Sequence, residues 1–176
     1  MNKSMGQTLS LSIIVGLVFS MTPLFAEDTP VTRGTMVNLK GVSVISEHIQ
    51  PNLRRYAEKA GLNAPQMQMD IENRLRSAGI RTVSGPDWLK TPGRPVLYVN
   101  INTHEMDKFW YAYDIKLELR QIVCLEQDPK VKTLADTWSI NITGVTHVGN
   151  LGLIKKDSLV LLEKFIKAYA AVNKPM

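Results

Sequence analysis

The sequence predicts an α+β fold: a mostly antiparallel, mixed sheet of about five strands with two helices packed on one face. Residues 109–125, FWYAYDIKLELRQIVCL, alternate apolar and polar side chains, as in a strand with one buried and one solvated face. Residues 63–78 and 153–173 each carry an apolar stripe at helical spacing. With 176 residues, 44% of them hydrophobic, the chain fits one folded domain.

The first 26 residues have the order of a secretory signal peptide. One lysine precedes an apolar run at residues 9–19, and the small residue Ala26 precedes two acidic residues. We expect cleavage after Ala26; an uncleaved anchor is the alternative, although a run of about 11 residues is shorter than a membrane span of roughly 20. The prediction is therefore a periplasmic or secreted protein, with residues 27–35 as a flexible leader and residues 36–176 as a single domain.

In the first half of the domain, the expected elements alternate between strand and helix. Residues 36–46 alternate as a strand does, and residues 51–60 fit a turn or one loose helical turn. Asn63 is a good helix cap, Gly79 is a good helix terminator, and the apolar side chains between them recur every three or four residues. Residues 80–83 then fit a short strand.

The second half is predicted to be a run of strands closed by a helix. Residues 84–95 hold two glycines and three prolines, which indicates a loop. Residues 96–103 are expected to pair as a hairpin with residues 109–125, and residues 132–145 to form the last strand. Residues 153–173 form the closing helix. The expected order is β, α, β, β, β, β, α, with both helices on one face of the sheet.

The alternation in residues 109–125 divides core candidates from contact candidates. Tyr113 and Leu117 belong to the apolar set, which we expect to face the helices. Cys124, the single cysteine, is interpreted as a small buried hydrophobe, so no disulfide within the chain is expected. The polar set is expected to face solvent or a partner and supplies the candidate binding residues: Trp110, Asp114, Lys116, Glu118 and Arg120.

No catalytic residue, metal ligand or cofactor site is predicted. His48, His104 and His147 lie far apart in the sequence, with no second ligand at metal-binding spacing. Phosphate-binding loops and nucleophile elbows have no counterpart in the sequence. The alternative is a small periplasmic hydrolase or ligand-binding protein whose site gathers four residues from neighbouring loops: Asp87, Trp88, His104 and Glu105.

The charge is modestly basic and scattered. The formal net charge is +5, and loss of the lysine in residues 1–26 would leave +4. No basic run of the kind that binds nucleic acid is present, so no nucleic-acid partner is expected. Weak contact with anionic surfaces remains an option for the closing helix, through Lys155, Lys156, Lys164 and Lys167.

Five segments together resemble, in order, a family of small exported bacterial proteins of unknown function. The segments are DIENRLRSAGI (70–80), RPVLYVNI (94–101), YAYDIKLELRQIVCL (111–125), TW (137–138) and FIKAYAAVN (165–173). The arrangement is more remotely similar to the amino-terminal domain of TolB-type periplasmic proteins, a mixed sheet covered by two helices that serves protein–protein contacts. This likeness implies no catalytic residue.

The leading hypothesis is therefore a non-enzymatic envelope protein that binds another envelope protein or assembles with itself through its sheet.

Overall fold

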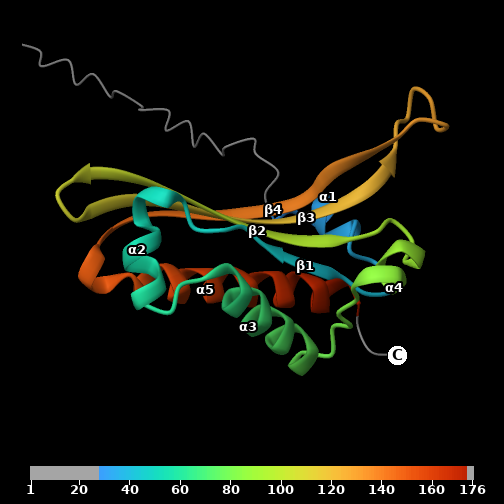
Figure 1. The fold of residues 1–176 in the computed structure, drawn as a ribbon. Helices are drawn as coiled ribbons and strands as arrows, with labels where there is room; N and C mark the ends of the chain where they lie inside the picture. Colours follow the sequence, from blue (N-terminus) through green and yellow to red (C-terminus); the bar gives the residue numbers. More distant parts are fainter. Residues whose placement is uncertain (1–27, 174–176) are drawn as a thin grey trace, which may run out of the picture.

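The structure is a computed structural model that describes residues 28–173, so the predicted signal peptide and its cleavage site lie outside the described residues. Figure 1 shows a sheet above a layer of helices. The strands are β1 (Ser43–Ser46), β2 (Val96–Asp107), β3 (Trp110–Cys124) and β4 (Lys132–His147). The helices are α1 (Pro30–Gly34), α2 (Pro51–Lys59), α3 (Ala64–Ser77), α4 (Gly85–Lys90) and α5 (Gly152–Val172), with a 3-10 turn at Val148–Asn150.

The four strands form one mixed sheet in the order β1-β2-β3-β4. β1 runs parallel to β2, whereas β2, β3 and β4 are antiparallel neighbours. β3 is the central long strand, with Ile115 paired to Ile101 on one side and to Ile142 on the other. The predicted α+β class and mixed sheet are confirmed.

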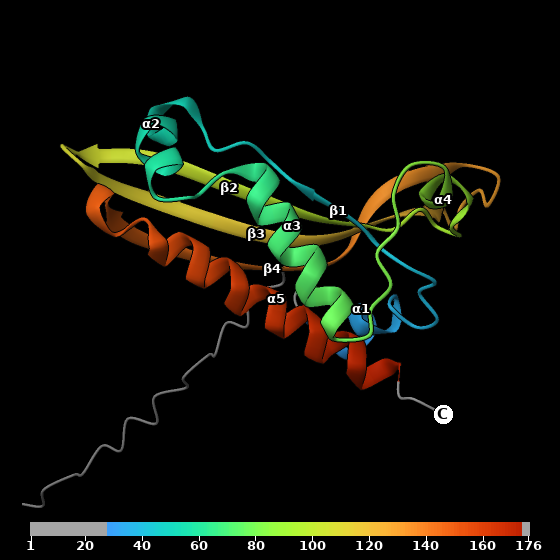
Figure 2. The same ribbon diagram turned by 60° about the horizontal axis from the view of Figure 1, so that its bottom comes forward.

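The two long helices, α3 and α5, lie on the same face of the sheet, as Figures 1 and 2 show from two directions. Between these helices and the sheet, the core side chains of β3 are almost fully buried: Tyr111, Tyr113, Ile115, Leu117 and Leu119. Since residues two apart on a strand share a face, the alternation of the sequence is sufficient to place this set in the core. The face that α3 and α5 cover is the core face; the opposite one is called the open face below.

The expectation of about five strands overstates the sheet by one. The expected strand 36–46 is only four residues long in the structure, and the expected strand 80–83 is reduced to a single bridge between Thr82 and Val42. A Cβ atom on Gly41 would lie 2.8 Å from Val83 Cγ1, so the glycine permits this close crossing. Residues 51–60, expected as a turn or one loose helical turn, contain the regular helix α2.

Part of the segment expected to be a flexible leader, residues 27–35, forms the helix α1. Thr29 and Thr32 form a reciprocal capping box at its start. The Asp28 carboxylate accepts two hydrogen bonds from Arg33 (2.5 and 2.6 Å) and one from the indole of Trp138 (3.0 Å). Trp138 is fully buried, with its ring centroid 5.3 Å from that of Phe165. The segment is therefore attached to the core through an acidic side chain.

Tyr113 joins β3 to both β4 and α5. Its hydroxyl donates a hydrogen bond to Asp157 Oδ2 at 2.6 Å. Burial first, and then the hydrogen bond and charge of Asp157, raise the pKa of Tyr113 to about 12. Gly144 is the residue paired with Tyr113 on β4, and a Cβ atom there would lie only 2.5 Å from the end of the ring. The glycine makes room for a ring that is held by burial and by Asp157.

We therefore predict that Gly144→Ala lowers the free energy of unfolding by about 1–3 kcal/mol, because the added methyl group overpacks a fixed ring. Gly152→Ala is the matched control: its new Cβ atom would have no neighbour within 4 Å, so little change is expected. Urea unfolding measures both. Equal stability of the two variants would contradict the packing described for Tyr113.

Candidate functional site

The candidate binding residues lie on or beside the open face, but not all of them are accessible. Trp110 is 49% exposed, and its ring centroid lies 5.4 Å from that of His147. Asp114 accepts hydrogen bonds from Asn141 Nδ2 (3.1 Å) and Thr143 Oγ1 (2.7 Å) across the strand pair. The exposure predicted for Trp110 is observed, while Asp114 is already used to join β3 to β4.

Glu118 lies on the open face and points away from the helices, yet its side chain is only 2% exposed. Lys116 and Arg120, two residues before and after it on β3, form salt bridges with its two carboxylate oxygens. The distance from Arg120 Nη2 to Glu118 Oε2 is 2.7 Å. Tyr98 and Ser139 are its cross-strand neighbours. Glu118 is expected to face solvent or a partner, but in the structure Lys116 and Arg120 cover it, because alternation does not reveal how neighbours fold over a side chain.

Arg120 ties three strands together on this face. Its Nε atom lies 3.0 Å from Asp136 Oδ1 on β4, and its Cζ atom lies 3.7 Å from the centre of the Tyr98 ring on β2. Burial raises the pKa of Glu118, but the hydrogen bond and charge of Lys116 and the charge of Arg120 outweigh this, so the pKa is lowered from its usual value. Glu118 therefore stays ionised between its two cationic neighbours, which is typical of a salt-bridge network that stabilises the fold.

The alternative four-residue site does not assemble. Trp88 lies at the end of the sheet where β2 begins, near Val96. His104 and Glu105 lie at the other end of β2, about 26 Å further along at the usual rise of roughly 3.3 Å per residue. Asp87 belongs to the exposed turn of α4. The structure therefore does not bring these residues to one place.

β4 is an edge strand of the sheet in residues 28–173. Near Thr137 this edge is covered, because Thr35 Oγ1 lies 3.4 Å from the Thr137 carbonyl and Asp28 contacts Trp138. Residues 140–146, INITGVT, follow without a strand on their outer side, without a charge and without a proline. Every second residue of such an edge directs its N–H and C=O groups outward. This segment is called the β4 edge below.

The opposite edge is formed by β1 and by the part of β2 beyond it, where side chains occupy the backbone groups of Thr103. β1 is short, and β2 extends beyond it. There, Gln50 accepts a hydrogen bond from the Thr103 amide (3.0 Å), and Asn52 donates one to the Thr103 carbonyl (3.0 Å). These two residues of the α2 region occupy backbone groups that another strand would need. The β4 edge therefore offers a longer uninterrupted run of strand backbone than the four-residue β1 does.

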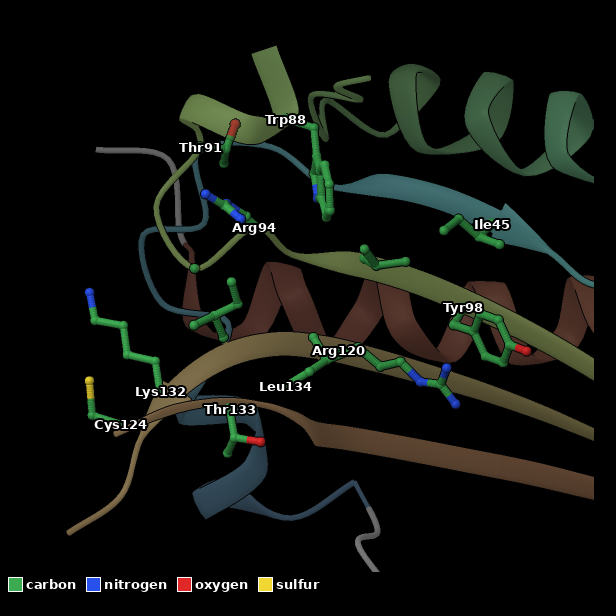
Figure 3. A pocket seen from close by; sticks show the side chains of 13 residues that line it. Ile45, Trp88, Thr91, Arg94, Tyr98, Arg120, Cys124, Lys132, Thr133 and Leu134 are labelled. Carbon is green, nitrogen blue, oxygen red and sulfur yellow. The ribbon is translucent and has the colours of Figure 1, made fainter. Parts of the chain in front are cut away.

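A groove of about 760 Å³ opens on the open face where α4 approaches the sheet (Figure 3). Its floor is apolar and its walls come from α4 and the following loop. We call it the groove; it is lined by Ile45, Trp88, Thr91, Gly93, Arg94, Val96, Tyr98, Arg120, Ile122, Cys124, Lys132, Thr133 and Leu134.

The sequence contains a signal for this groove that the prediction missed. The polar set of β3 stops at Arg120, and the next two residues on the same face are Ile122 and Cys124. Cys124 is exposed, so its interpretation as a buried side chain is wrong. It lies at the end of β3, beyond the cover of the long helices. Two consecutive apolar positions on an otherwise polar face indicate a contact surface. This change of pattern in the sequence is the signal for the groove.

The charged residues of α5 are only partly available. Lys155 forms a salt bridge with Asp70 on α3, at 2.7 Å. Lys156, Lys164 and Lys167 are exposed. Contact of this helix with anionic surfaces remains a prediction.

No protein-family model matches the sequence, and no curated protein matches it. The resemblances given above therefore stay expectations. Among residues 28–173, no three histidine, cysteine or carboxylate side chains gather as a metal site would require. Within the same residues, no helix has both the length and the apolar character needed to cross a membrane.

We predict that Glu118→Gln lowers the free energy of unfolding at pH 7 by about 1–3 kcal/mol, because Lys116 and Arg120 lose a buried anionic acceptor. Because the folded-state pKa of Glu118 is lowered, its contribution is complete above the unfolded-state pKa of about 4.3 and is lost as the pH falls below it. The stability gap between the parent protein and the variant should thus narrow from pH 6 to pH 3.

The control is Asp114→Asn, the same change on the same strand, where the carboxylate has two neutral donors and no salt bridge among the described residues. We expect a smaller loss, below about 1 kcal/mol. Denaturant unfolding at several pH values measures both variants. A gap that is constant with pH for Glu118→Gln would refute the role given to its charge.

Proposed function

We propose that the chain is an exported, non-enzymatic binding protein that pairs with a second copy of itself through the β4 edge. The observation that carries the proposal is the β4 edge itself: seven consecutive residues with no charge, no proline and no strand on their outer side in the part of the chain described. Edge strands in monomeric proteins are usually protected by charges, prolines or covering segments. An edge without these features favours strand addition.

A second copy is the occupant that the edge chemistry favours. Antiparallel pairing of two identical edges is a closed, two-fold contact, in which each copy offers the same surface. Because the segment is uncharged, no like charges oppose each other across the pair. The two four-stranded sheets would then join into one continuous sheet. The helices of both copies would cover the same face of this joined sheet. The signal-like residues 1–26 support export to the periplasm or the outside of the cell.

We predict that the purified protein dimerises with increasing concentration and that Thr143→Lys weakens this at least roughly tenfold, because two ammonium groups would meet near the centre of the pair. The control is Asn102→Lys. Asn102 and Thr143 are the two cross-strand neighbours of Asp114, so the same charge is added at the same level of the sheet, but on β2.

Sedimentation equilibrium over a range of concentrations distinguishes the outcomes. Loss of the dimer in Thr143→Lys, with an intact dimer in Asn102→Lys, is the expected result. A parent protein that stays monomeric, or a Thr143→Lys variant that dimerises as tightly as the parent protein, would overturn the proposal.

A further inference from the structure

The groove is a second surface with a different chemistry. Its floor receives one aliphatic side chain from each strand: Ile45 from β1, Val96 from β2, Ile122 from β3 and Leu134 from β4. Ile45 is 45% exposed and Leu134 is 57% exposed. Figure 3 shows Ile45 and Leu134 on the sheet and the Trp88 ring extending from α4 toward it. The volume lies within the roughly 300–1,000 Å³ of small-molecule sites.

The charges around this floor have one sign. Arg94, Arg120 and Lys132 line the groove, and no acidic side chain does. Arg120 is engaged by Glu118 and Asp136, but among residues 28–173 neither Arg94 nor Lys132 has a carboxylate oxygen within salt-bridge distance. Both lie at the same end of the groove in Figure 3, across from each other. An anionic group bound between them would neutralise the positive charge at that end of the groove.

The backbone of Arg94 is fixed at the groove by a tight turn. Its φ is 43°, a left-handed conformation that is uncommon for residues other than glycine. The turn is fixed by a hydrogen bond from the Arg94 amide to the Thr91 carbonyl (3.0 Å) and by one from the Ile122 amide to the Gly93 carbonyl (2.7 Å). On the groove wall, Trp88 Nε1 is buried and has no hydrogen-bond acceptor among residues 28–173.

We propose that the groove binds a free fatty carboxylate, an alkyl chain with an anionic head. The chain lies on the aliphatic floor and the carboxylate lies between Arg94 and Lys132. A peptide fits this floor less well, because the groove lies on the face of the sheet, where the strand N–H and C=O groups are already paired. An alkyl chain needs no hydrogen bonds. This site is separate from the β4 edge and does not depend on the proposed function.

Isothermal titration of the purified protein with octanoate, decanoate and dodecanoate, each below its micelle-forming concentration, tests the proposal. Burial of each methylene group is worth about 0.8 kcal/mol, so the affinity should rise about fourfold for each added CH₂ group. Dodecyltrimethylammonium has the same chain with a cationic head and should bind at least roughly tenfold more weakly than dodecanoate. Equal affinity for the two heads, or no dependence on chain length, would overturn the proposal.

A pair of variants locates the site. Leu134→Glu places a carboxylate in the groove and should weaken dodecanoate binding at least roughly tenfold, whereas Met106→Glu, near the far end of β2 and 61% exposed, should bind as the parent protein does. Circular dichroism verifies that both variants fold. Unchanged binding by Leu134→Glu contradicts the assignment.

Two further binding experiments test whether the groove takes a ligand of another kind. Vesicles of anionic phospholipid test a membrane surface, and an apolar peptide with a free carboxyl terminus tests a protein segment. Binding of either one in the absence of dodecanoate binding would overturn the proposal. As a second readout, dodecanoate should slow alkylation of Cys124, which lines the groove and is exposed. Sedimentation of Leu134→Glu should show the parent dimerisation, which separates this test from that of the β4 edge.

Discussion

Burial of one face of β3 is the constraint on which the rest of the structure depends. β3 pairs along most of its length with β2 and β4. Its core side chains fill the space between the sheet and the helices α3 and α5. A shift of one residue in register would move this set to the open face. Tyr113 makes such a shift costly, because its ring needs the space above Gly144 and its hydroxyl needs Asp157. Everything accessible on the open face follows from this register.

The sequence was sufficient for the class of the fold and for the core face, because a period of two or of 3.6 determines which side chains share a face. It was not sufficient where side chains from distant segments meet. Asp28 and Trp138 are far apart in the chain, and their hydrogen bond could not be read from either segment. Glu118 shared the polar pattern of its strand, yet Lys116 and Arg120 fold over it. Strand number failed for a similar reason, since the short segment at Thr82 makes only one bridge.

The two accessible surfaces differ in the interaction that they offer. The β4 edge presents backbone N–H and C=O groups to a strand and carries little side-chain specificity. The groove presents apolar side chains with cations at one end, on a part of the sheet whose backbone groups are paired. Leu134 and Ile142 lie on the same strand, but about 26 Å apart at the usual rise for a strand, and they point to opposite faces. The two proposals, a second copy at the β4 edge and a fatty carboxylate in the groove, are therefore compatible with each other.

Hydroxyl-radical footprinting, with each oxidised residue identified by mass spectrometry, tests the burial of β3 most directly. The account predicts that Tyr113, Leu117 and Trp138 are protected in the native protein, while Trp110 and Leu134 are oxidised readily. All five should become reactive when the protein is unfolded in denaturant. Rapid oxidation of Tyr113 and Leu117 under native conditions, with protection of Trp110 and Leu134, would contradict the assignment of the two faces.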